Sequence, residues 1–398
     1  MRRAAIVSPL RTPVGAFGGS LREAPVETLG STVVKAVIER SGIDPARIED
    51  VVMAQSYANS ETPCVGRWVA LAADLPIEVP GLQIDRRCGG GLQAIATAAM
   101  MVESGACDVV LAGGVESMSR IEYYTTDMRW GKRAGTTELY DRLERGRERS
   151  QPVERFGRIS GMIETAENLA RDYRITREEA DAFAAESHRR AATAWSEGRF
   201  AAEVVPVHVP QRKGEAIIFD RDEGIRPQST PASLAKLPVL MKDGIVTAGN
   251  SAQQNDAAAA CLVVAEDKLH ELDLTPMAFL VGWSAVGCEP SRMGIGPVPA
   301  TAKLLTKSGL TLEAMGLVEI NEAFAAQVLA VLKGLDWDDR DRLNVNGSGI
   351  SLGHPIGATG VRIMTTLLHE MERRKVRFGL ETMCIGGGQG MAAIFERS

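Results

Sequence analysis

Four separated motifs hold the residues of this chain that are best suited to covalent chemistry. They contain Cys88 in RRCGGGLQA, Asn321 in INEAFA, His354 in GHPIGATG and Cys384 in MCIGGGQG. Each lies beside glycines or at the start of an apolar helical run, where free backbone N–H groups and the helix dipole favour a thiolate or an oxyanion. Two sulfurs in one site would allow acyl transfer, because one can hold the acyl group while the other removes a proton.

Cys88 is the candidate nucleophile, since three glycines and an apolar helix follow it. Such a position is expected to lower the pKa of a thiol from about 8.5 to roughly 3.5–7.5. The alternative for any free cysteine is a small buried hydrophobe. Cys384 follows a predicted strand and precedes another run of three glycines, a pattern that is also typical of a simple tight turn. As a base it would take a proton from the α-carbon of an acetyl thioester.

His354 and Asn321 are the candidate polar partners of the two sulfurs. His354 lies between Gly353 and Pro355, which restrict the backbone and favour an imidazole directed into a pocket. Asn321 precedes the helix-like run EAFAAQVLAVLKG, so it is equally suited to cap that helix. The residues around Asn321 do not decide between a cap and a site residue.

Two halves of the chain repeat one order of elements. In the first half the hydrophobic periodicity predicts helices at 26–43 and 90–105 and strands at 51–56 and 108–114. In the second half it predicts helices at 299–310 and 358–375 and strands at 317–321 and 379–388. Cys88 and His354 occupy equivalent places, each ahead of a central helix. A pseudo-twofold arrangement would bring both helix N-termini toward one pocket.

A segment of mixed charge interrupts the first half. It contains the helix-like run TREEADAFAAESHRRAATAW, in which Thr176 and Glu179 fit a capping box. The apolar, glycine-rich pattern returns after it, which indicates an insertion that could cover a site. The predicted domains are residues 1–118 plus 244–270, an inserted loop domain at 119–243, and residues 271–398.

The composition excludes several classes of protein. The chain has 398 residues, 45% hydrophobic residues, 40 glycines and 5% aromatic residues, which suits helices packed closely on parallel strands. A net charge of −6 argues against a general nucleic-acid binder, and no apolar run reaches the roughly 20 residues of a membrane span. The start MRRAAIVSPLRTPVG predicts a first strand. The six cysteines lack metal-ligand spacing. We therefore expect a cytoplasmic protein with reduced thiols and without a bound metal.

The glycines after Cys88 also admit a dinucleotide site. The run from Gly89 to Ala94 fits GxGxxA, and Asp108 lies 19 residues beyond Gly89. A dinucleotide loop normally follows an apolar strand directly, whereas LQIDRR places three charges before these glycines. The context therefore disfavours this alternative.

The four motifs resemble those of the thiolases, the acetyl-CoA acyltransferases. Their order, together with GGVESMSR (113–120), TAGN (247–250) and GIGPVPA (294–300), extends the resemblance over essentially the whole chain. The resemblance implies a five-layered αβαβα fold of two similar halves, with a loop domain that helps to bind coenzyme A. It also implies a homodimer or homotetramer that uses coenzyme A as a substrate and needs no tightly bound cofactor.

The resemblance also implies roles for the motif residues. Cys88 would carry the acyl group, with His354 taking its proton, and Cys384 would be the α-carbon base. Asn321 would hold a water that forms one oxyanion hole with His354. The backbone N–H groups of Cys88 and Gly386 would form the second hole.

Other positions would then contact the substrates, which are acetyl-CoA, acyl-CoA and 3-oxoacyl-CoA. Arg226 and Ser233 are expected to contact the coenzyme A part. Ala323 and Phe324 are expected to contact the pantetheine arm, and Met162 and Met293 the acyl group. Simple helix packing is an alternative for Ala323 and Phe324.

Some positions depart from the common family pattern. Asp85 and Gly90 replace a frequent asparagine and serine, and Gly161 and Ala252 replace a histidine and a serine of short-chain members. The last two changes favour 3-oxoacyl chains longer than four carbons, as in fatty-acid β-oxidation, unless neighbouring side chains fill the space.

Two further function classes remain open at this point. A decarboxylating ketoacyl synthase-like enzyme would share the fold and a cysteine nucleophile but would not need Cys384 as a base. A non-catalytic acyl-CoA or lipid carrier could retain the fold without the chemistry.

Overall fold

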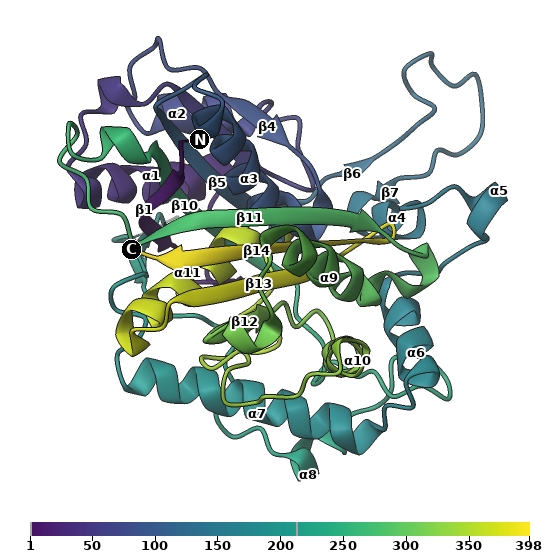
Figure 1. Ribbon diagram of the computed structural model, residues 1–398. Helices are drawn as coiled ribbons and strands as arrows, with labels where there is room; N and C mark the ends of the chain where they lie inside the picture. The colour runs from purple at the N-terminus through teal and green to yellow at the C-terminus, as the bar shows by residue number, and fades with distance from the viewer. Residues whose placement is uncertain (1, 212–213) are drawn as a thin grey trace.

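One ten-stranded sheet organises the computed structural model, which describes residues 2–211 and 214–398 (Figure 1). Nine strands follow each other in space: β12 (Leu317–Ile320), β13 (Phe378–Ile385), β14 (Gln389–Arg397), β11 (Ala278–Gly287), β1 (Ala4–Arg11), β10 (Asn255–Ala265), β5 (Val109–Ser117), β3 (Asp50–Ala54) and β4 (Leu82–Ile84). The short strand β2 (Gly15–Ala16) pairs with β10. Strands β1 and β11 pair only through Ala5 with Phe279 and Ile6 with Ala278. This narrow junction divides the sheet into two half-sheets.

The two half-sheets have the same strand order. The N-terminal one runs β1-β10-β5-β3 and the C-terminal one β11-β14-β13-β12. In each, the last two strands pair in parallel and the middle pair is antiparallel. The predicted repeat of two similar halves is therefore confirmed. The first strand predicted from MRRAAIVSPLRTPVG is β1.

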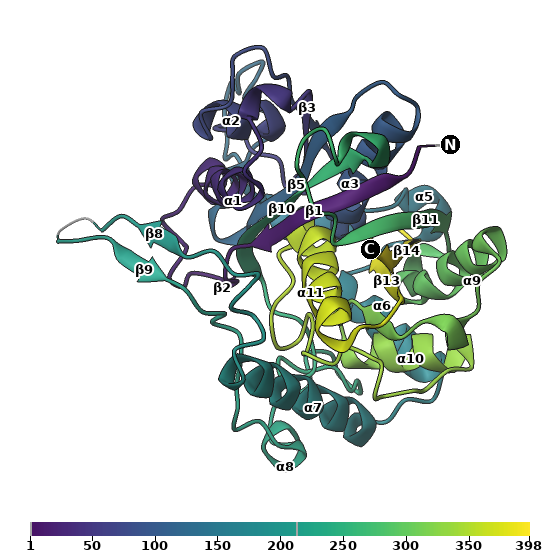
Figure 2. The ribbon, with the colours of Figure 1, turned by 60° about the vertical axis from the view of Figure 1, so that its left-hand side comes forward.

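Helices cover both half-sheets and fill the space between them, as Figure 2 shows. The outer helices of the N-terminal half are α1 (Val26–Ser41) and α2 (Val65–Ala72), those of the C-terminal half are α9 (Pro297–Ser308) and α10 (Ala325–Leu335), and the central helices are α3 (Gly90–Glu103) and α11 (Thr359–Arg374). The result is the five-layered αβαβα arrangement that was predicted. No helix in the described part of the chain is long and apolar enough to cross a membrane.

The central helices approach each other closely at their N-terminal ends. A Cβ atom on Gly91 of α3 would lie 2.9 Å from the backbone nitrogen of Val361. A Cβ atom on Gly360 of α11 would lie 2.2 Å from the backbone nitrogen of Leu92. Only glycine fits such a contact without a shift of the backbone. These two glycines therefore allow the turns before α3 and α11, which carry Cys88 and His354, to meet.

A long segment connects β5 to β10, whereas residues 386–388 alone connect the equivalent strands β13 and β14. Its helices and strands are β6 (Tyr123–Tyr124), β7 (Tyr140–Asp141), α4 (Arg142–Glu148), α5 (Val153–Phe156), α6 (Met162–Asp172), α7 (Arg177–Ser196), β8 (Val207–Val209), β9 (Ile217–Phe219) and α8 (Pro231–Leu234). The predicted capping box of Thr176 and Glu179 is present at the start of α7. The segment falls where the insertion was predicted, and its domain limits of 119 and 243 stay a prediction.

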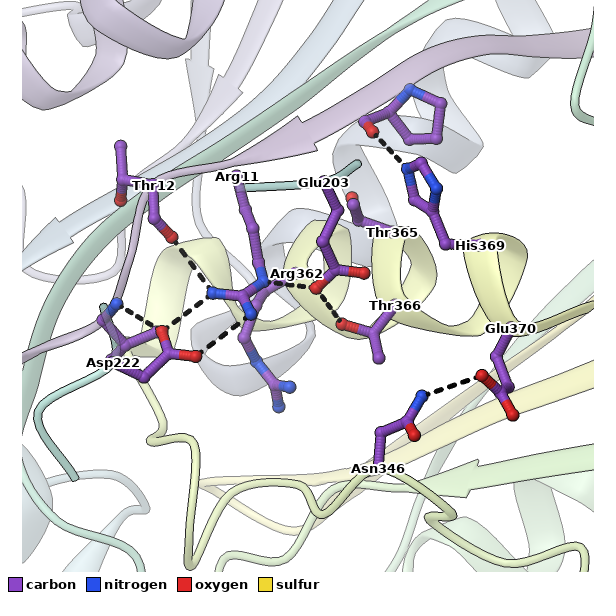
Figure 3. Close-up of polar contacts among 12 residues, drawn as sticks. Arg11, Thr12, Glu203, Asp222, Asn346, Arg362, Thr365, Thr366, His369 and Glu370 are labelled. Carbon is purple, nitrogen blue, oxygen red and sulfur yellow. Dashed lines mark hydrogen bonds and ion pairs between the residues drawn. The ribbon is translucent and has the colours of Figure 1, made fainter. Parts of the chain in front are cut away.

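A buried ion network fastens this segment to the core (Figure 3). Arg11, at the end of β1, donates from Nε to Glu203 Oε1 at 2.6 Å and from Nη1 to Asp222 Oδ1 at 2.8 Å. Thr366 of α11 also donates to Glu203, at 2.8 Å. Burial alone would lower the pKa of Arg11, but the two carboxylates outweigh it and raise that pKa. The charge of Arg11 is therefore fully neutralised inside the protein.

Candidate active site

Cys88 lies in a short turn, Arg87–Gly89, immediately before α3. Two hydrogen bonds fix this turn: Asp85 Oδ1 accepts from the backbone nitrogen of Arg87 at 2.7 Å, and Ser56 Oγ donates to the carbonyl oxygen of Arg87 at 3.0 Å. Asp85, one of the departures from the family pattern, thus has a local structural role. The sulfur of Cys88 is half-buried in the wall of a pocket.

The pKa of the Cys88 thiol departs from the prediction. Burial raises it above the ordinary value, and this effect outweighs the backbone N–H groups of Gly386 and Cys88 and the charges of Arg87 and Arg147, which lower it. The expectation of a strongly lowered pKa is therefore wrong for the free protein, because desolvation of the sulfur dominates. These are the N–H groups that the resemblance assigns to the second oxyanion hole, a role that stays a prediction. A thiol in this state needs a base to accept its proton.

His354, which lines the same pocket, is the candidate for this base. Its Nδ1 atom lies 2.7 Å from Thr359 Oγ1, and this hydroxyl donates its own hydrogen to the carbonyl oxygen of Pro355 at 2.9 Å. The hydroxyl must then accept a hydrogen from Nδ1, which leaves Nε2 unprotonated and able to accept a proton. Burial lowers the pKa of His354 to about 3, with Arg362 and Arg147 adding to the effect. The imidazole is therefore neutral at physiological pH.

Asn255 holds the backbone of the same turn. Its Oδ1 atom accepts from the His354 nitrogen at 2.8 Å, and its Nδ2 donates to the carbonyl oxygen of Gly15 at 3.0 Å. Because Asn255 begins β10, the histidine turn of one half is tied to the start of an interior strand of the other half.

Asn321 does not cap a helix. Helix α10 begins at Ala325, its N-cap is Phe324, and no side chain caps it. Asn321 is buried instead at the end of β12, where its Nδ2 atom lies 3.4 Å from Nδ1 and 3.5 Å from Nε2 of His354. Asn321 Oδ1 has no hydrogen-bond partner among the described residues, so it is available to accept one. The helix-cap alternative for Asn321 is therefore wrong, and its role in the oxyanion hole stays a prediction.

Cys384 is fully buried near the end of β13. It packs with Met293, Ala323 and Phe324, and with the partly buried Met162. Burial raises the pKa of its thiol well above the ordinary value, and negative charge on Cys88 raises it further. The two sulfurs are therefore close enough to influence each other's ionisation, although only Cys88 lines the pocket.

One pocket of about 100 Å³ collects most of the predicted site residues. Cys88, His354 and Gly386 line it, together with the four residues expected at the pantetheine and acyl parts of the substrate: Met162, Met293, Ala323 and Phe324. Arg226 and Ser233 do not line this pocket and are exposed on the inserted segment. Arg226 uses one guanidinium nitrogen to donate to the carbonyl oxygens of Glu223 and Ile225, at 2.6 and 3.2 Å. Their role in binding coenzyme A remains a prediction.

The predicted substrate range was based on Gly161 and Ala252, and these two positions have different environments. Ala252 lines the pocket, whereas a Cβ atom on Gly161 would meet no atom within 4 Å. Gly161 has a φ of 152° just before α6. Side-chain-bearing residues rarely adopt this conformation. Gly161 does not line the pocket, and a histidine placed there would strain the backbone.

Sequence reasoning missed several residues that support the site. Thr359 and Asn255 orient His354, and Glu116 of β5 joins the two halves by accepting from the backbone nitrogens of Ser56 (3.1 Å), Tyr57 (3.2 Å) and Gly357 (2.9 Å). These three hydrogen bonds lower the pKa of Glu116, but burial outweighs them and raises it to about 7. Thr359 was detectable in GHPIGATG as a hydroxyl near the histidine. Arg147, which also lines the pocket, had no signal in its charged segment.

Comparisons with known proteins agree with this geometry. The family model described as Thiolase, N-terminal domain matches residues 4–267, and that described as Thiolase, C-terminal domain matches residues 274–397. A protein of Chromobacterium violaceum named acetyl-CoA acetyltransferase is 46% identical over 394 residues, which is 99% of each chain. A Pseudomonas aeruginosa protein of the same name is 44% identical over 399 residues, 100% of each chain.

Solved structures show the same fold. The Bacillus anthracis acetyl-CoA acetyltransferase superimposes with a TM-score of 0.96 at 42% identity, covering 100% of this chain and 99% of that one. Human mitochondrial 3-ketoacyl-CoA thiolase in complex with CoA superimposes with a TM-score of 0.93 at 39% identity, covering 100% and 98%. Since both family domains match in order over nearly the full length, the chain belongs to the thiolase family of acyltransferases.

Proposed function

We propose that this thiolase performs reversible, coenzyme A-dependent cleavage of 3-oxoacyl-CoA with Cys88 as the acyl carrier. The observation that carries the proposal is the convergence on one pocket of the Cys88 sulfur, the Gly386 N–H group and the neutral imidazole of His354. This combination supplies a nucleophile, an oxyanion donor and a base.

In the cleavage direction, His354 accepts the proton of Cys88 as the sulfur attacks the 3-oxo carbon. The bond between carbons 2 and 3 then breaks, the acyl group stays on Cys88, and the two-carbon fragment leaves as the enolate of acetyl-CoA. Cys384 donates the proton that converts this enolate into acetyl-CoA. Burial of both sulfurs keeps them protonated until the reaction requires transfer.

In the second step, coenzyme A replaces acetyl-CoA in the pocket. The Cys384 thiolate left by the first step takes the proton of its thiol, the coenzyme A sulfur attacks the acyl group on Cys88, and His354 returns its proton to the Cys88 sulfur. This releases acyl-CoA and restores the free enzyme. In the reverse direction, Cys384 removes a proton from the methyl group of acetyl-CoA and the carbanion attacks the acyl-enzyme. The route needs no metal or redox cofactor, since each step moves only protons and an acyl group.

Several further assignments belong to this proposal. Arg226 and Ser233 would bind the coenzyme A part of the substrate, and the enzyme would work in the cytoplasm as a homodimer or homotetramer. The vacated volume at Ala252 supports acyl chains longer than four carbons, as in β-oxidation, since each buried methylene contributes about 0.8 kcal/mol.

The test follows the absorbance of the magnesium complex of the acetoacetyl-CoA enolate. Addition of coenzyme A and the enzyme should remove this absorbance, and acetyl-CoA should form at two molecules per molecule consumed. A decarboxylating synthase or a non-catalytic carrier would leave the signal unchanged. Loss of the signal without added coenzyme A would contradict thiolysis.

A further inference from the structure

The reaction pocket contains positive charge that the proposed acyl transfer does not use. Arg87 and Arg147 both line the pocket, and no Asp or Glu among the described residues does. Arg87 belongs to the Cys88 turn, where its Nη1 donates to the carbonyl oxygen of Ser56 at 3.3 Å and its Nε lies 4.0 Å from Asp85. The charge of Arg87 is therefore partly balanced by its neighbours.

Arg147 is the less satisfied of the two. It is half-buried on α4, and within the described chain no carboxylate lies at ion-pair distance from it. Other arginines of this helix have partners: Arg142 pairs with Glu122 at 2.8 Å, and Arg145 stacks on the ring of Tyr140 at 3.5 Å. A partly desolvated guanidinium without a counter-charge costs free energy, so its presence in a pocket indicates an anionic ligand group.

The position of Arg147 limits where that anionic group can lie. Its charge acts on Cys88, His354 and Tyr57, so it lies near the sulfur that carries the acyl group. The phosphates of coenzyme A are at the opposite end of the pantetheine arm from the reacting thioester. A negative charge on the acyl group itself is therefore the better match. Gln253 and Gln254 also line the pocket and can donate hydrogen bonds to such a group.

We propose that the acyl group carried by Cys88 ends in a carboxylate that pairs with Arg147, so that the preferred substrates are 3-oxoacyl-CoA thioesters of dicarboxylic acids. This inference rests on the proposed thiolase function and specifies its substrate class. The chemistry is unchanged: the bond between carbons 2 and 3 breaks, the carboxyacyl group moves to Cys88, and acetyl-CoA leaves after protonation. Planar Arg matches a carboxylate with two parallel hydrogen bonds, which gives both affinity and orientation.

The experiment compares two substrates of equal chain length, 3-oxohexanedioyl-CoA and 3-oxohexanoyl-CoA. The ratio of their kcat/KM values for thiolysis is measured for the wild type and for Arg147→Gln, Arg147→Lys and Arg149→Gln. The wild type should favour the dicarboxylic substrate by about tenfold or more, the effect of a hydrogen bond between charged groups. Arg147→Gln should abolish this preference, and Arg147→Lys should retain part of it. Arg149→Gln, which removes an exposed charge next to the same helix, should leave the ratio unchanged.

The outcomes separate this proposal from the general function. A wild type that cleaves both substrates but favours 3-oxohexanoyl-CoA overturns the carboxylate proposal and leaves the thiolase function intact. Equal losses of kcat/KM for both substrates in Arg147→Gln also overturn it, since the guanidinium would then serve coenzyme A or the nucleophile. Failure to cleave either substrate or acetoacetyl-CoA overturns the thiolase function itself.

Discussion

Arg11 and Arg147 show two ways in which this protein uses a guanidinium group. Arg11 is fully buried and meets two carboxylates, Glu203 and Asp222, that fasten the inserted segment to β1 (Figure 3). Arg147 is half-buried in the reaction pocket and meets no carboxylate of the described chain. The first charge is balanced within the protein, whereas the second is left for a ligand.

The difference distinguishes a structural region from a reacting one. All three guanidinium nitrogens of Arg11 donate to the carboxylates of Glu203 and Asp222, so this charge is balanced within the protein. In the pocket, the guanidinium of Arg147 has no carboxylate partner among the described residues. Asn321, which contacts His354 but does not line the pocket, has an Oδ1 atom without a partner among them. Unsatisfied polar groups are costly in a folded protein and are expected where substrate completes the hydrogen bonding.

The largest expected effect concerns Cys384, which lies behind the pocket. Cys384→Ala should slow the exchange of the acetyl-CoA methyl hydrogens with deuterated solvent by about 10²–10⁴-fold, because the base is lost. Acylation of Cys88 by acetyl-CoA should persist. Proton exchange by NMR and the extent of acylation by intact-protein mass spectrometry give the two readouts.

Cys288→Ala is the matched control, since this thiol also lies close enough for its charge to affect Cys384. It should keep both partial reactions. Exchange that survives in Cys384→Ala and fails in Cys288→Ala would move the base to Cys288.

The second expected effect tests the structural region. Asp222→Ala removes the acceptor of Arg11, of the Val14 nitrogen and of Trp195 Nε1. Breaking a buried ion pair in this way should lower the free energy of unfolding by about 3–5 kcal/mol. Chemical denaturation followed by tryptophan fluorescence measures the loss.

The exposed pair of Lys35 and Asp74 provides the comparison, since its atoms lie 2.6 Å apart with side chains that are 50% and 83% exposed. Lys35→Ala should cost no more than about 1 kcal/mol. Equal losses of unfolding free energy in the two variants would show that burial does not make the ion pairs of Arg11 more stabilising than an exposed pair.

The third effect is smaller and concerns the orientation of His354. Thr359→Val removes the hydroxyl that accepts from Nδ1, so the ring loses its preferred tautomer. Acylation of Cys88 should slow by roughly tenfold to a hundredfold, the cost of one buried hydrogen bond. Rapid-quench measurements of acyl-enzyme formation test this.

Thr359→Ser keeps the hydroxyl and should restore most of the rate. A Thr359→Ser variant as slow as Thr359→Val would indicate that packing of the methyl group, and not the hydroxyl, sets the rate of Cys88 acylation.

The smallest effect is a shift in the titration of Cys88. Because burial raises the pKa of this thiol, its alkylation by iodoacetamide should increase as the pH rises through 9, without the plateau near neutrality of a low-pKa thiolate. The charge of Arg147 lowers this pKa, so Arg147→Gln should move the titration to higher pH. Quantifying the alkylated Cys88 peptide by mass spectrometry gives the rate. A shift to lower pH would contradict the placement of Arg147 near the sulfur.

Much of the fold was predictable because its signals are local and repeated. Hydrophobic periodicity located α1, α3, α9 and α11, and the two halves that it suggested have the same strand order. The glycines of GGGLQA and GATG were informative for another reason, since close approach of the central helices needs Gly91 and Gly360. The family and its acyltransferase class followed from the four motifs and are confirmed.

The rest depended on contacts between distant parts of the chain. Asn255 meets His354 across 99 positions and Arg11 meets Asp222 across 211, so neither pair leaves a local pattern. The pKa of Cys88 was predicted wrongly because glycines indicate N–H donors but not the burial of the sulfur. The cap proposed for Asn321 failed because α10 begins four residues later than that residue.

Trapping the acyl-enzyme tests the central claim most directly. The wild type is mixed with acetyl-CoA, quenched in acid and digested, and the peptides are analysed by tandem mass spectrometry. A 42-dalton acetyl group on the peptide containing Cys88, absent in Cys88→Ala, is the predicted result. An acetyl group on Cys384, or acetylation that survives in Cys88→Ala, would contradict the assignment of Cys88 as the acyl carrier.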